Sequence, residues 1–130
     1  MSGVLVVGSF VQDLAFRTEV FPAPGETRVG SFFAGPGGKG FNQAVASHRQ
    51  GVPTKFIGAV GSDIFAEGLQ AFVKHEGINA ALLEISNATT GAASIVVNKD
   101  GQNQIIVSLG ANDYLTSNFV DINFGSPRVV

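Results

Sequence analysis

The sequence has 130 residues, of which 45% are hydrophobic and 14% are charged, which is enough for one globular domain with a core and too little for two. Eight basic and ten acidic residues give a net charge of -2, so the chain lacks the positive surface that a nucleic-acid partner requires. It has no cysteine, which excludes disulfides and thiolate metal sites, and its two histidines, His48 and His75, are too far apart to suggest a pair of metal ligands.

The first apolar run, Val-Leu-Val-Val at 4–7, is short and β-branched. It is too short for a signal peptide or a membrane span, and it is typical of a strand that is covered on both faces. We therefore expect a central strand of an α/β sheet in a cytoplasmic protein with no membrane partner.

A hairpin-like excursion is predicted next. Residues 14–21 and 28–34 are extended segments that contain Phe and Val, and the stretch between them, Pro-Ala-Pro-Gly-Glu at 22–26, favours a turn.

The pattern then changes to an alternation of helices and strands. Apolar residues recur at helical spacing over 41–50, and Gly51 follows where a helix cap belongs. Residues 55–60 predict a strand, and 63–75 predict a helix with an acidic start and a basic end. This order is typical of an α/β domain.

A second hairpin is predicted in the last third of the chain. Residues 92–98 and 104–109 are β-branched runs, and the stretch between them, Lys-Asp-Gly-Gln-Asn at 99–103, is a strong turn signal.

Beyond that hairpin, Asn112 or Asp113 is expected to cap a weak helix that ends before Gly125. An apolar β-branched run then starts within 126–130. A chain that stops in such a run suggests a fragment of a longer domain.

The most unusual segment is Gly-Pro-Gly-Gly-Lys-Gly-Phe-Asn at 35–42, where glycines surround Lys39 at the start of the predicted helix. Glycines allow a ligand to approach the main chain closely, and a helix start supplies free N–H donors, so the segment suits hydroxyls or anions. Lys39 and Asn42 lie three residues apart and share one helix face, where an ammonium and an amide could bind a sugar. The alternative is an ordinary glycine-rich loop with a capping polar residue.

Two other glycine motifs compete with the sugar-binding interpretation. Gly35, Gly37 and Gly40 satisfy the dinucleotide-binding pattern G-x-G-x-x-G with Asp63 downstream, but that motif belongs directly after the first strand, and in this chain a hairpin intervenes. A nicotinamide-dependent oxidoreductase is thus a minor hypothesis. A P-loop requires glycine at position 33, which is Phe33, so that motif is absent.

A series of short motifs resembles the landmarks of ribokinase-type (PfkB-family) sugar kinases. The most specific is Gly-Gly-Lys-Gly-Phe-Asn-Gln-Ala at 37–44, because its glycines, lysine and asparagine coincide with a predicted helix start. The other landmarks are Gly8-Ser9 with Asp13, Pro24 to Thr27, Gly58 to Asp63, Thr90-Gly91, Asp100-Gly101 and Gly110 to Asn112. Their order and spacing match over nearly the whole chain.

The resemblance implies a fold and a set of binding residues. The fold is the N-terminal part of a ribokinase-like doubly wound α/β sheet with helices on both faces, and residues 14–34 and 92–109 form a small β-hairpin lid. The sugar would be bound by Asp13, at the end of the first strand, and by residues of the glycine-rich turn, namely Gly37, Gly38, Lys39 and Asn42. Asp13 as a turn residue is the alternative, and for Asp63 and His48 we favour structural roles.

The resemblance also implies a reaction, the transfer of the ATP γ-phosphoryl group to a sugar hydroxyl, with ribose as the leading substrate. The family's G-A-G-D segment, which carries the catalytic base and an anion hole, does not occur in this sequence. We therefore expect no catalytic, metal or cofactor residues in these 130 residues, an inactive fragment, and ATP, Mg²⁺ and K⁺ bound mostly by a missing C-terminal half.

Two consequences of the resemblance concern partners and specificity. Lids of this family often form a homodimer interface, which is expected in this protein as well. Ribokinases usually carry Asn two residues before the equivalent of Asp13, where this chain has Val11. Other pentoses, fructose-like sugars and nucleosides thus stay open as substrates, and a non-catalytic sugar-binding or oligomerisation module is the alternative function.

Overall fold

The described chain, residues 3–125 of a computed structural model, forms two sheets with different surroundings. In chain order the elements are β1 (Val4–Val7), β2 (Val11–Arg17), β3 (Ser31–Gly37), α1 (Lys39–Arg49), β4 (Thr54–Gly61), α2 (Ile64–Glu76), β5 (Asn79–Ile85), β6 (Ala92–Val97), β7 (Asn103–Ser108), the 3-10 helix η1 (Gly110–Tyr114) and α3 (Ser117–Phe124).

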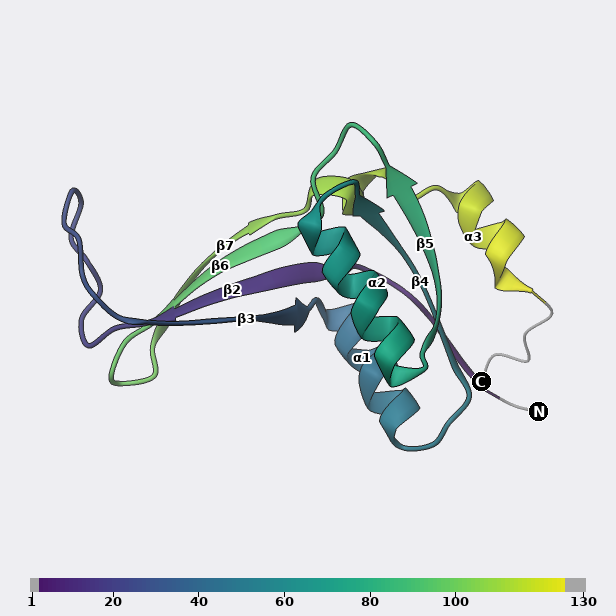
Figure 1. The fold of residues 1–130 in the computed structure, drawn as a ribbon, viewed down its shortest axis with the longest axis horizontal. Helices are drawn as coiled ribbons and strands as arrows, with labels where there is room; N and C mark the ends of the chain where they lie inside the picture. Colours follow the sequence, from purple (N-terminus) through teal and green to yellow (C-terminus); the bar gives the residue numbers. More distant parts are fainter. Residues whose placement is uncertain (1–2, 126–130) are drawn as a thin grey trace.

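The first sheet, which we call the core sheet, consists of the parallel strands β1, β4 and β5 with β4 in the middle. Helices α1 and α2 lie side by side over one of its faces (Figure 1). A cluster of apolar side chains fills the space between them: Phe10, Phe41, Ala44, Phe56, Val60, Ala66, Leu69, Val73 and Ile78. Three parallel strands with covering helices are the start of the expected α/β sheet.

Strand β4 shows why this sheet forms the core. Phe56 and Val60 point toward the helices, whereas Ile57 and Ala59, which alternate with them along the strand, point to the opposite face. All four are fully buried. A strand that is apolar on both sides needs cover on both sides.

The two helices end where the sequence predicts. Gly51 follows α1 with a φ of 80°, and Gly77 caps α2 in the left-handed conformation. Asp63 begins α2, since its Oδ1 accepts a hydrogen bond from the backbone N–H of Ala66 at 2.9 Å. Both helix predictions, over 41–50 and 63–75, are confirmed within two residues at each end.

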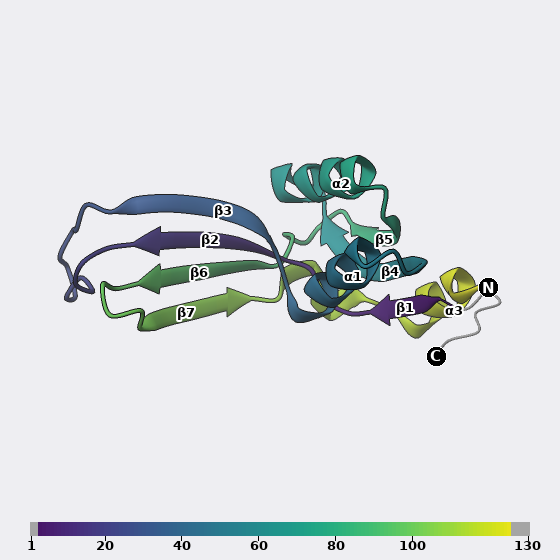
Figure 2. The same ribbon diagram turned by 90° about the horizontal axis from the view of Figure 1, so that it is seen from below.

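The second sheet, which we call the lid sheet, has the strand order β3-β2-β6-β7. The hairpins β2–β3 and β6–β7 are antiparallel, and the parallel pairing of β2 with β6 joins them into one sheet. Figure 2 shows this sheet extending away from the core as an arm. The pairing confirms both hairpins, although the strands run over 11–17 and 31–37 rather than 14–21 and 28–34.

That shift changes the setting of the glycine motif. Gly35, Pro36 and Gly37 lie in β3 and not in a turn. Proline is tolerated there because β3 is an edge strand of the lid sheet, where an N–H group is not needed for pairing.

Other predictions need correction. Strand β1 pairs only with β4 among the described residues, so 4–7 is an edge strand in this part of the chain, and Val7 is 45% exposed. The strand β5 at 79–85 was not predicted. Thr116 caps α3 in place of Asn112 or Asp113, since its hydroxyl accepts from the Phe119 N–H at 3.2 Å.

The expected strand start within 126–130 lies outside the described residues. Within 3–125, no helix is both long enough and apolar enough to cross a membrane.

Candidate functional site

The residues predicted to bind sugar lie where the chain passes between the two sheets. Gly8 to Phe10 lead from β1 into β2, and Gly38 leads from β3 into α1. These two passages touch, because the backbone N–H of Phe41 donates to the carbonyl of Ser9 at 3.3 Å. The start of α1 therefore rests on the connection between β1 and β2.

Asp13 is the third residue of β2 and pairs with Gly35 on β3. It thus lies in the lid sheet, which corrects the prediction that it ends the first strand; β1 stops at Val7, and the chain has already left the core sheet. Its carboxylate lies directly against Gly37, where an added Cβ would overlap it. A side chain at position 37 would displace the carboxylate, so glycine is required for this arrangement.

The Asp13 carboxylate is half-buried, and among residues 3–125 no hydrogen bond or ion pair engages it. Burial raises its pKa above the ordinary value of 3.8, because a charged carboxylate loses hydration there without gaining a partner. Its oxygens can thus accept hydrogen bonds from a ligand.

Gly38 and Gly40 allow close packing at the start of α1. Gly38 has a φ of 96°, a backbone conformation that favours glycine, and an added Cβ there would also collide with the carbonyl of Ser9. An added Cβ at Gly40 would approach the Cα of Gly8 to 2.9 Å. The helix start consequently lies within van der Waals distance of the connection that leads to Asp13.

Lys39 and Asn42 lie in the first turn of α1 and are exposed. Neither side chain makes an ion pair or hydrogen bond within the described part of the chain. The arrangement offers a carboxylate on one sheet and an ammonium and an amide at the adjacent helix start, which suits a ligand with several hydroxyls. The binding roles of Asp13, Gly37, Gly38, Lys39 and Asn42 stay predictions.

Asp63 and His48 have the structural roles favoured from the sequence. Asp63 caps α2 and also accepts hydrogen bonds from the Thr90 hydroxyl at 2.6 Å and the Thr90 N–H at 2.8 Å. Desolvation by burial opposes ionisation, but these hydrogen bonds outweigh it and hold the pKa of Asp63 below its ordinary value. Nε2 of His48, on α1, lies 2.8 Å from the carbonyl oxygen of Glu76 on α2.

Sequence reasoning missed the polar residues that connect the two sheets. Thr90 is 2% exposed, and its hydroxyl accepts from the Gly61 N–H at 2.9 Å while it donates to Asp63. Asn112 bonds to the backbone of Phe10 through its side-chain amide. In the sequence, both residues are parts of the motifs Thr90-Gly91 and Gly110 to Asn112. The motifs did not predict that these residues connect the two sheets.

The described residues do not fit a bound Mg²⁺–ATP. Within 3–125, no three His, Cys, Asp or Glu side chains come together as metal ligands. The only glycine-rich helix start described, that of α1, is the one predicted to face the sugar. We therefore derive no chemical step through the nucleotide.

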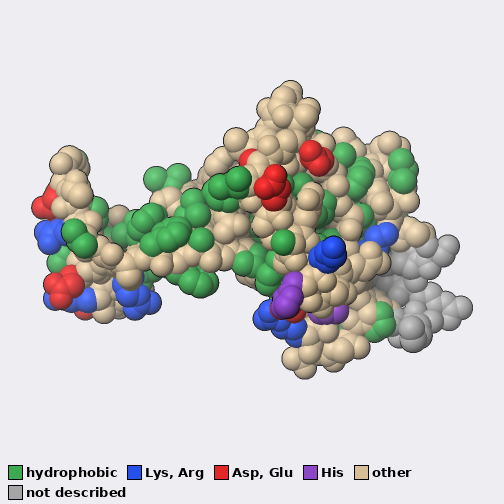
Figure 3. All heavy atoms as spheres, viewed as in Figure 1, with side chains coloured by type: hydrophobic (Ala, Val, Ile, Leu, Met, Phe, Trp, Pro, Cys, Tyr) green, Lys and Arg blue, Asp and Glu red, His purple; other side chains and the backbone are tan. Residues whose placement is uncertain are grey.

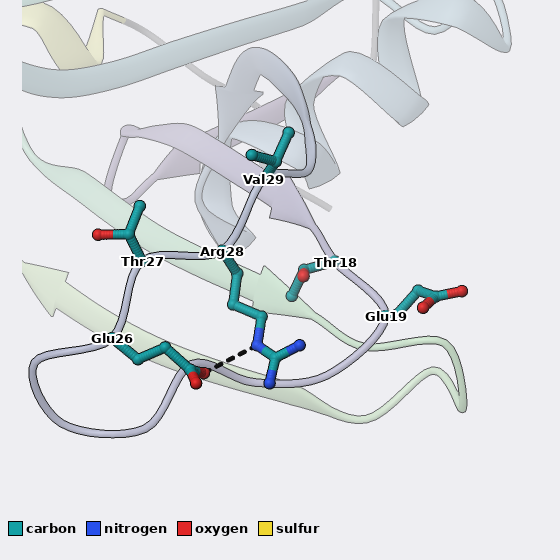
Figure 4. Close-up of a pocket in the computed structure, with 6 residues that line it drawn as sticks. All are labelled: Thr18, Glu19, Glu26, Thr27, Arg28 and Val29. Carbon is teal, nitrogen blue, oxygen red and sulfur yellow. Dashed lines mark hydrogen bonds and ion pairs between the residues drawn. The ribbon is translucent and has the colours of Figure 1, made fainter.

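A separate hollow of about 420 Å³ lies at the far tip of the lid sheet (Figure 4). It is open and lined by Thr18, Glu19, Glu26, Thr27, Arg28 and Val29. Glu26 and Arg28 form an ion pair at 2.8 Å across it, and that hydrogen bond from Arg28 lowers the pKa of Glu26. None of the predicted sugar-binding residues lines this hollow.

Sequence comparison identifies the family. The family model described as pfkB family carbohydrate kinase matches residues 1–125. The chain is 39% identical to a ribokinase of Schizosaccharomyces pombe over 128 residues, covering 92% of this chain and 40% of that protein. It is 41% identical to a ribokinase of Mus musculus over 118 residues (89% and 36%), and 36% identical to a deoxyribokinase of Salmonella typhi over 120 residues (91% and 39%). The chain thus spans about two fifths of these relatives' length.

Solved structures support the same assignment. The ribokinase of Giardia lamblia superposes with a TM-score of 0.86 at 37% identity, covering 93% of this chain and 38% of that one. The ribokinase of Arabidopsis thaliana, solved in complex with ribose and ATP, superposes with a TM-score of 0.79 at 31% identity, covering 94% and 42%. The chain therefore belongs to the pfkB family of carbohydrate kinases and has the fold of the N-terminal part of a ribokinase.

Proposed function

We propose that the protein to which this sequence belongs is an ATP-dependent sugar kinase, with ribose as the leading substrate. These 130 residues would supply the lid and most of the sugar contacts. The observation that carries the proposal is the contact between the Asp13 carboxylate and Gly37, next to the start of α1, in a chain of the pfkB family.

The roles follow from the chemistry of the groups. Asp13 accepts hydrogen bonds from two sugar hydroxyls, because its carboxylate has no partner among the described residues. Lys39 and Asn42 bind further hydroxyls at the helix start. Glycine at 37 and 38 lets the sugar approach the main chain. These residues bind and orient the sugar, while the base and the phosphate-binding groups belong to a part of the protein not included in this sequence.

ATP is the proposed phosphoryl donor, in line with the relative solved with ribose and ATP. When bound, Mg²⁺–ATP supplies the γ-phosphoryl group and the charge that stabilises its transfer. Because these residues do not fit the nucleotide, we propose that the chain alone is inactive.

The identity of the sugar depends on the surroundings of Asp13. Val11 is 7% exposed and pairs with Gly37 in the lid sheet, so an apolar side chain stands two residues before Asp13 on the same face of β2. This side chain offers no hydrogen-bond partner to a sugar hydroxyl. Ribose and 2-deoxyribose are therefore the pair to compare, since one relative is a deoxyribokinase.

The test combines binding and turnover. Titration of the chain with ribose, followed by ¹H–¹⁵N NMR, should shift the amide signals of Asp13, Gly37, Gly38 and Asn42. A coupled ADP-release assay with ATP, Mg²⁺, K⁺ and a sugar panel should show no turnover. Ribose binding that leaves these signals unmoved would reject the site, and sugar-dependent turnover would reject the inactivity of the chain.

A non-catalytic sugar-binding or oligomerisation module is the second candidate. The exposed apolar side chains of the lid sheet favour it; Figure 3 shows hydrophobic atoms along the arm. The exposed apolar residues of the lid are Phe16, Phe32, Phe33, Ile105, Ile106, Val107 and Leu109. Patches of this kind mark interfaces, and we propose that a second copy of the lid covers them in a homodimer.

The dimer has its own test. Ile106 is 77% exposed, so Ile106→Glu should convert a dimer into a monomer in sedimentation analysis without loss of folding. Ile64→Glu is the matched control, because Ile64 is 74% exposed in α2, outside the lid sheet. A wild-type chain that is monomeric at all concentrations would contradict the interface.

A further inference from the structure

Asn112 of η1 holds the backbone of Phe10 from both sides. The Phe10 N–H donates to its Oδ1 at 3.1 Å, and its Nδ2 donates to the Phe10 carbonyl at 2.8 Å. Nδ2 also donates to the carbonyl of Leu109 at 2.8 Å. The Asn112 amide thus pairs with the backbone of Phe10 as a neighbouring strand would. It also bonds to Leu109, the residue directly after β7.

Phe10 lies where no strand is available to pair with it. The last backbone bond to the core sheet is Gly8 N–H to Ile57 O at 3.1 Å. Pairing resumes directly after Phe10, since Val11 pairs with Gly37 in the lid sheet and the Gln12 N–H donates to Gly91 O at 2.7 Å. Between them, Phe10 would have an unpaired N–H and C=O without Asn112. An unpaired buried backbone group loses its bonds to water without replacement, so the contact with Asn112 stabilises the folded chain.

The side chain of Phe10 is fixed as well. It is fully buried and packs edge-to-face on Phe41 of α1, with ring centroids 5.4 Å apart. Gly91 gives the amide its room, since an added Cβ there would overlap Asn112 Nδ2 and lie 2.8 Å from the Phe10 carbonyl. Phe10 is therefore a fixed point between the core sheet and β2.

We propose that Asn112 is a positioning residue for the sugar site. By holding Phe10 it fixes the direction in which β2 leaves the core sheet, and thereby the place of Asp13, three residues later, relative to Gly37 and Gly38. The effect on sugar binding rests on the proposed role of Asp13, whereas the effect on the place of Asp13 does not.

A role limited to folding predicts something different. If Asn112 only stabilises the fold, its removal changes the fraction of folded molecules, and Asp13 in those that remain folded keeps its surroundings. If Asn112 positions β2, the Asp13 carboxylate in the folded molecules moves away from Gly37 into water. The protonation of Asp13 in the folded state separates these two roles.

The experiment is a carboxyl ¹³C NMR titration of Asp13 in Asn112→Ala, which introduces no charge. The pKa of Asp13 should shift toward its ordinary value of 3.8, and ribose affinity should fall about tenfold or more. Asn118→Ala is the matched control, because Asn118 is exposed in α3, and it should change neither. A folded Asn112→Ala chain in which Asp13 titrates as in the wild type would overturn the proposal.

A measurement on the wild-type chain covers the case in which Asn112→Ala does not fold. The Phe10 amide should be protected from hydrogen exchange as strongly as the Gln12 amide, which donates to the Gly91 carbonyl just before β6. Exchange of Phe10 at the rate of an exposed loop amide would reject the contact on which the proposal depends. A shifted Asp13 titration with no ribose binding to the wild type would instead reject the proposed sugar site and leave the positioning role standing.

Discussion

The core sheet and the lid sheet are both built from apolar strands and differ in what covers them. Phe41 and Phe56 in the core are fully buried, whereas Phe33 and Ile106 in the lid are 69% and 77% exposed. Every residue of β7 is exposed. The core is therefore stabilised by burial, and the lid by its backbone pairing and by its attachments to the core.

Those attachments are concentrated in a few polar contacts between the sheets. Asp63 and Thr90 connect the start of α2 with the segment just before β6, and Asn112 connects η1 with Phe10, just before β2. An exposed apolar surface of this kind is typical of an interaction site. This difference between the sheets can be tested at single residues.

The largest effect is expected in the core. Phe41→Ala should lower the free energy of unfolding by about 3–5 kcal/mol, because the ring is fully buried against Phe10, Phe56 and Phe72. Urea unfolding followed by circular dichroism measures the change. Ile106→Ala in the lid is the counterpart and should cost less than about 0.5 kcal/mol in the monomer. Equal losses would mean that the lid is buried in solution.

The next effect concerns the attachment of the lid. Thr90→Val keeps the shape of a fully buried side chain and leaves the Gly61 N–H without its acceptor, so the chain should lose about 1–3 kcal/mol. Thr89→Val is the control next to it, because Thr89 is exposed, and it should be nearly neutral. If both variants unfold at the same urea concentration, the Thr90 hydroxyl contributes nothing to the attachment.

The sequence predicted the elements that local signals define. Gly51 and Asp63 mark helix ends through backbone conformation and capping, which depend on a few neighbouring residues. The turns at 22–26 and 99–103 marked both hairpins for the same reason. These features need no knowledge of the rest of the chain.

The remaining features depend on contacts between distant residues. The strand at 79–85 carries no strong β signal, and it forms because β4 offers an edge beside α2. The roles of Thr90 and Asn112 depend on partners 27 and 102 residues away. Asp13 was expected at the end of the first strand, because no local signal shows that Gly8 to Phe10 cross from one sheet to the other.

A smaller and more specific effect is expected at the predicted site. Gly37→Ala places a methyl group where the Asp13 carboxylate lies, and because that carboxylate ends a rotatable side chain it can move away at little cost in stability. Ribose affinity should fall about tenfold, measured by calorimetry, while the urea midpoint changes little. Gly68→Ala is the control, since its added methyl meets nothing in α2 and should slightly stabilise the helix. Unchanged affinity in Gly37→Ala would separate Asp13 from sugar binding.

The smallest effects concern the pH dependence of stability, and they have opposite signs at Asp13 and Asp63. The pKa of Asp13 is raised by burial, so its contribution to stability is present below 3.8 and is lost as the pH rises through its folded-state pKa. At pH 7 Asp13→Asn should therefore be more stable than the wild type, by a margin that partial exposure keeps small. This margin should disappear as the pH falls below 3.8.

The pKa of Asp63 is lowered, because the hydrogen bonds from Thr90 and the start of α2 outweigh desolvation. Its contribution is present above 3.8 and is lost as the pH falls through the lowered folded-state pKa, so Asp63→Asn should be less stable than the wild type at pH 7 and approach it in acid. Urea unfolding of both variants from about pH 3 to about pH 7 measures the two margins. Margins of the same sign at pH 7 would contradict the difference drawn between Asp13, which has no partner among the described residues, and Asp63, which is bonded to Thr90.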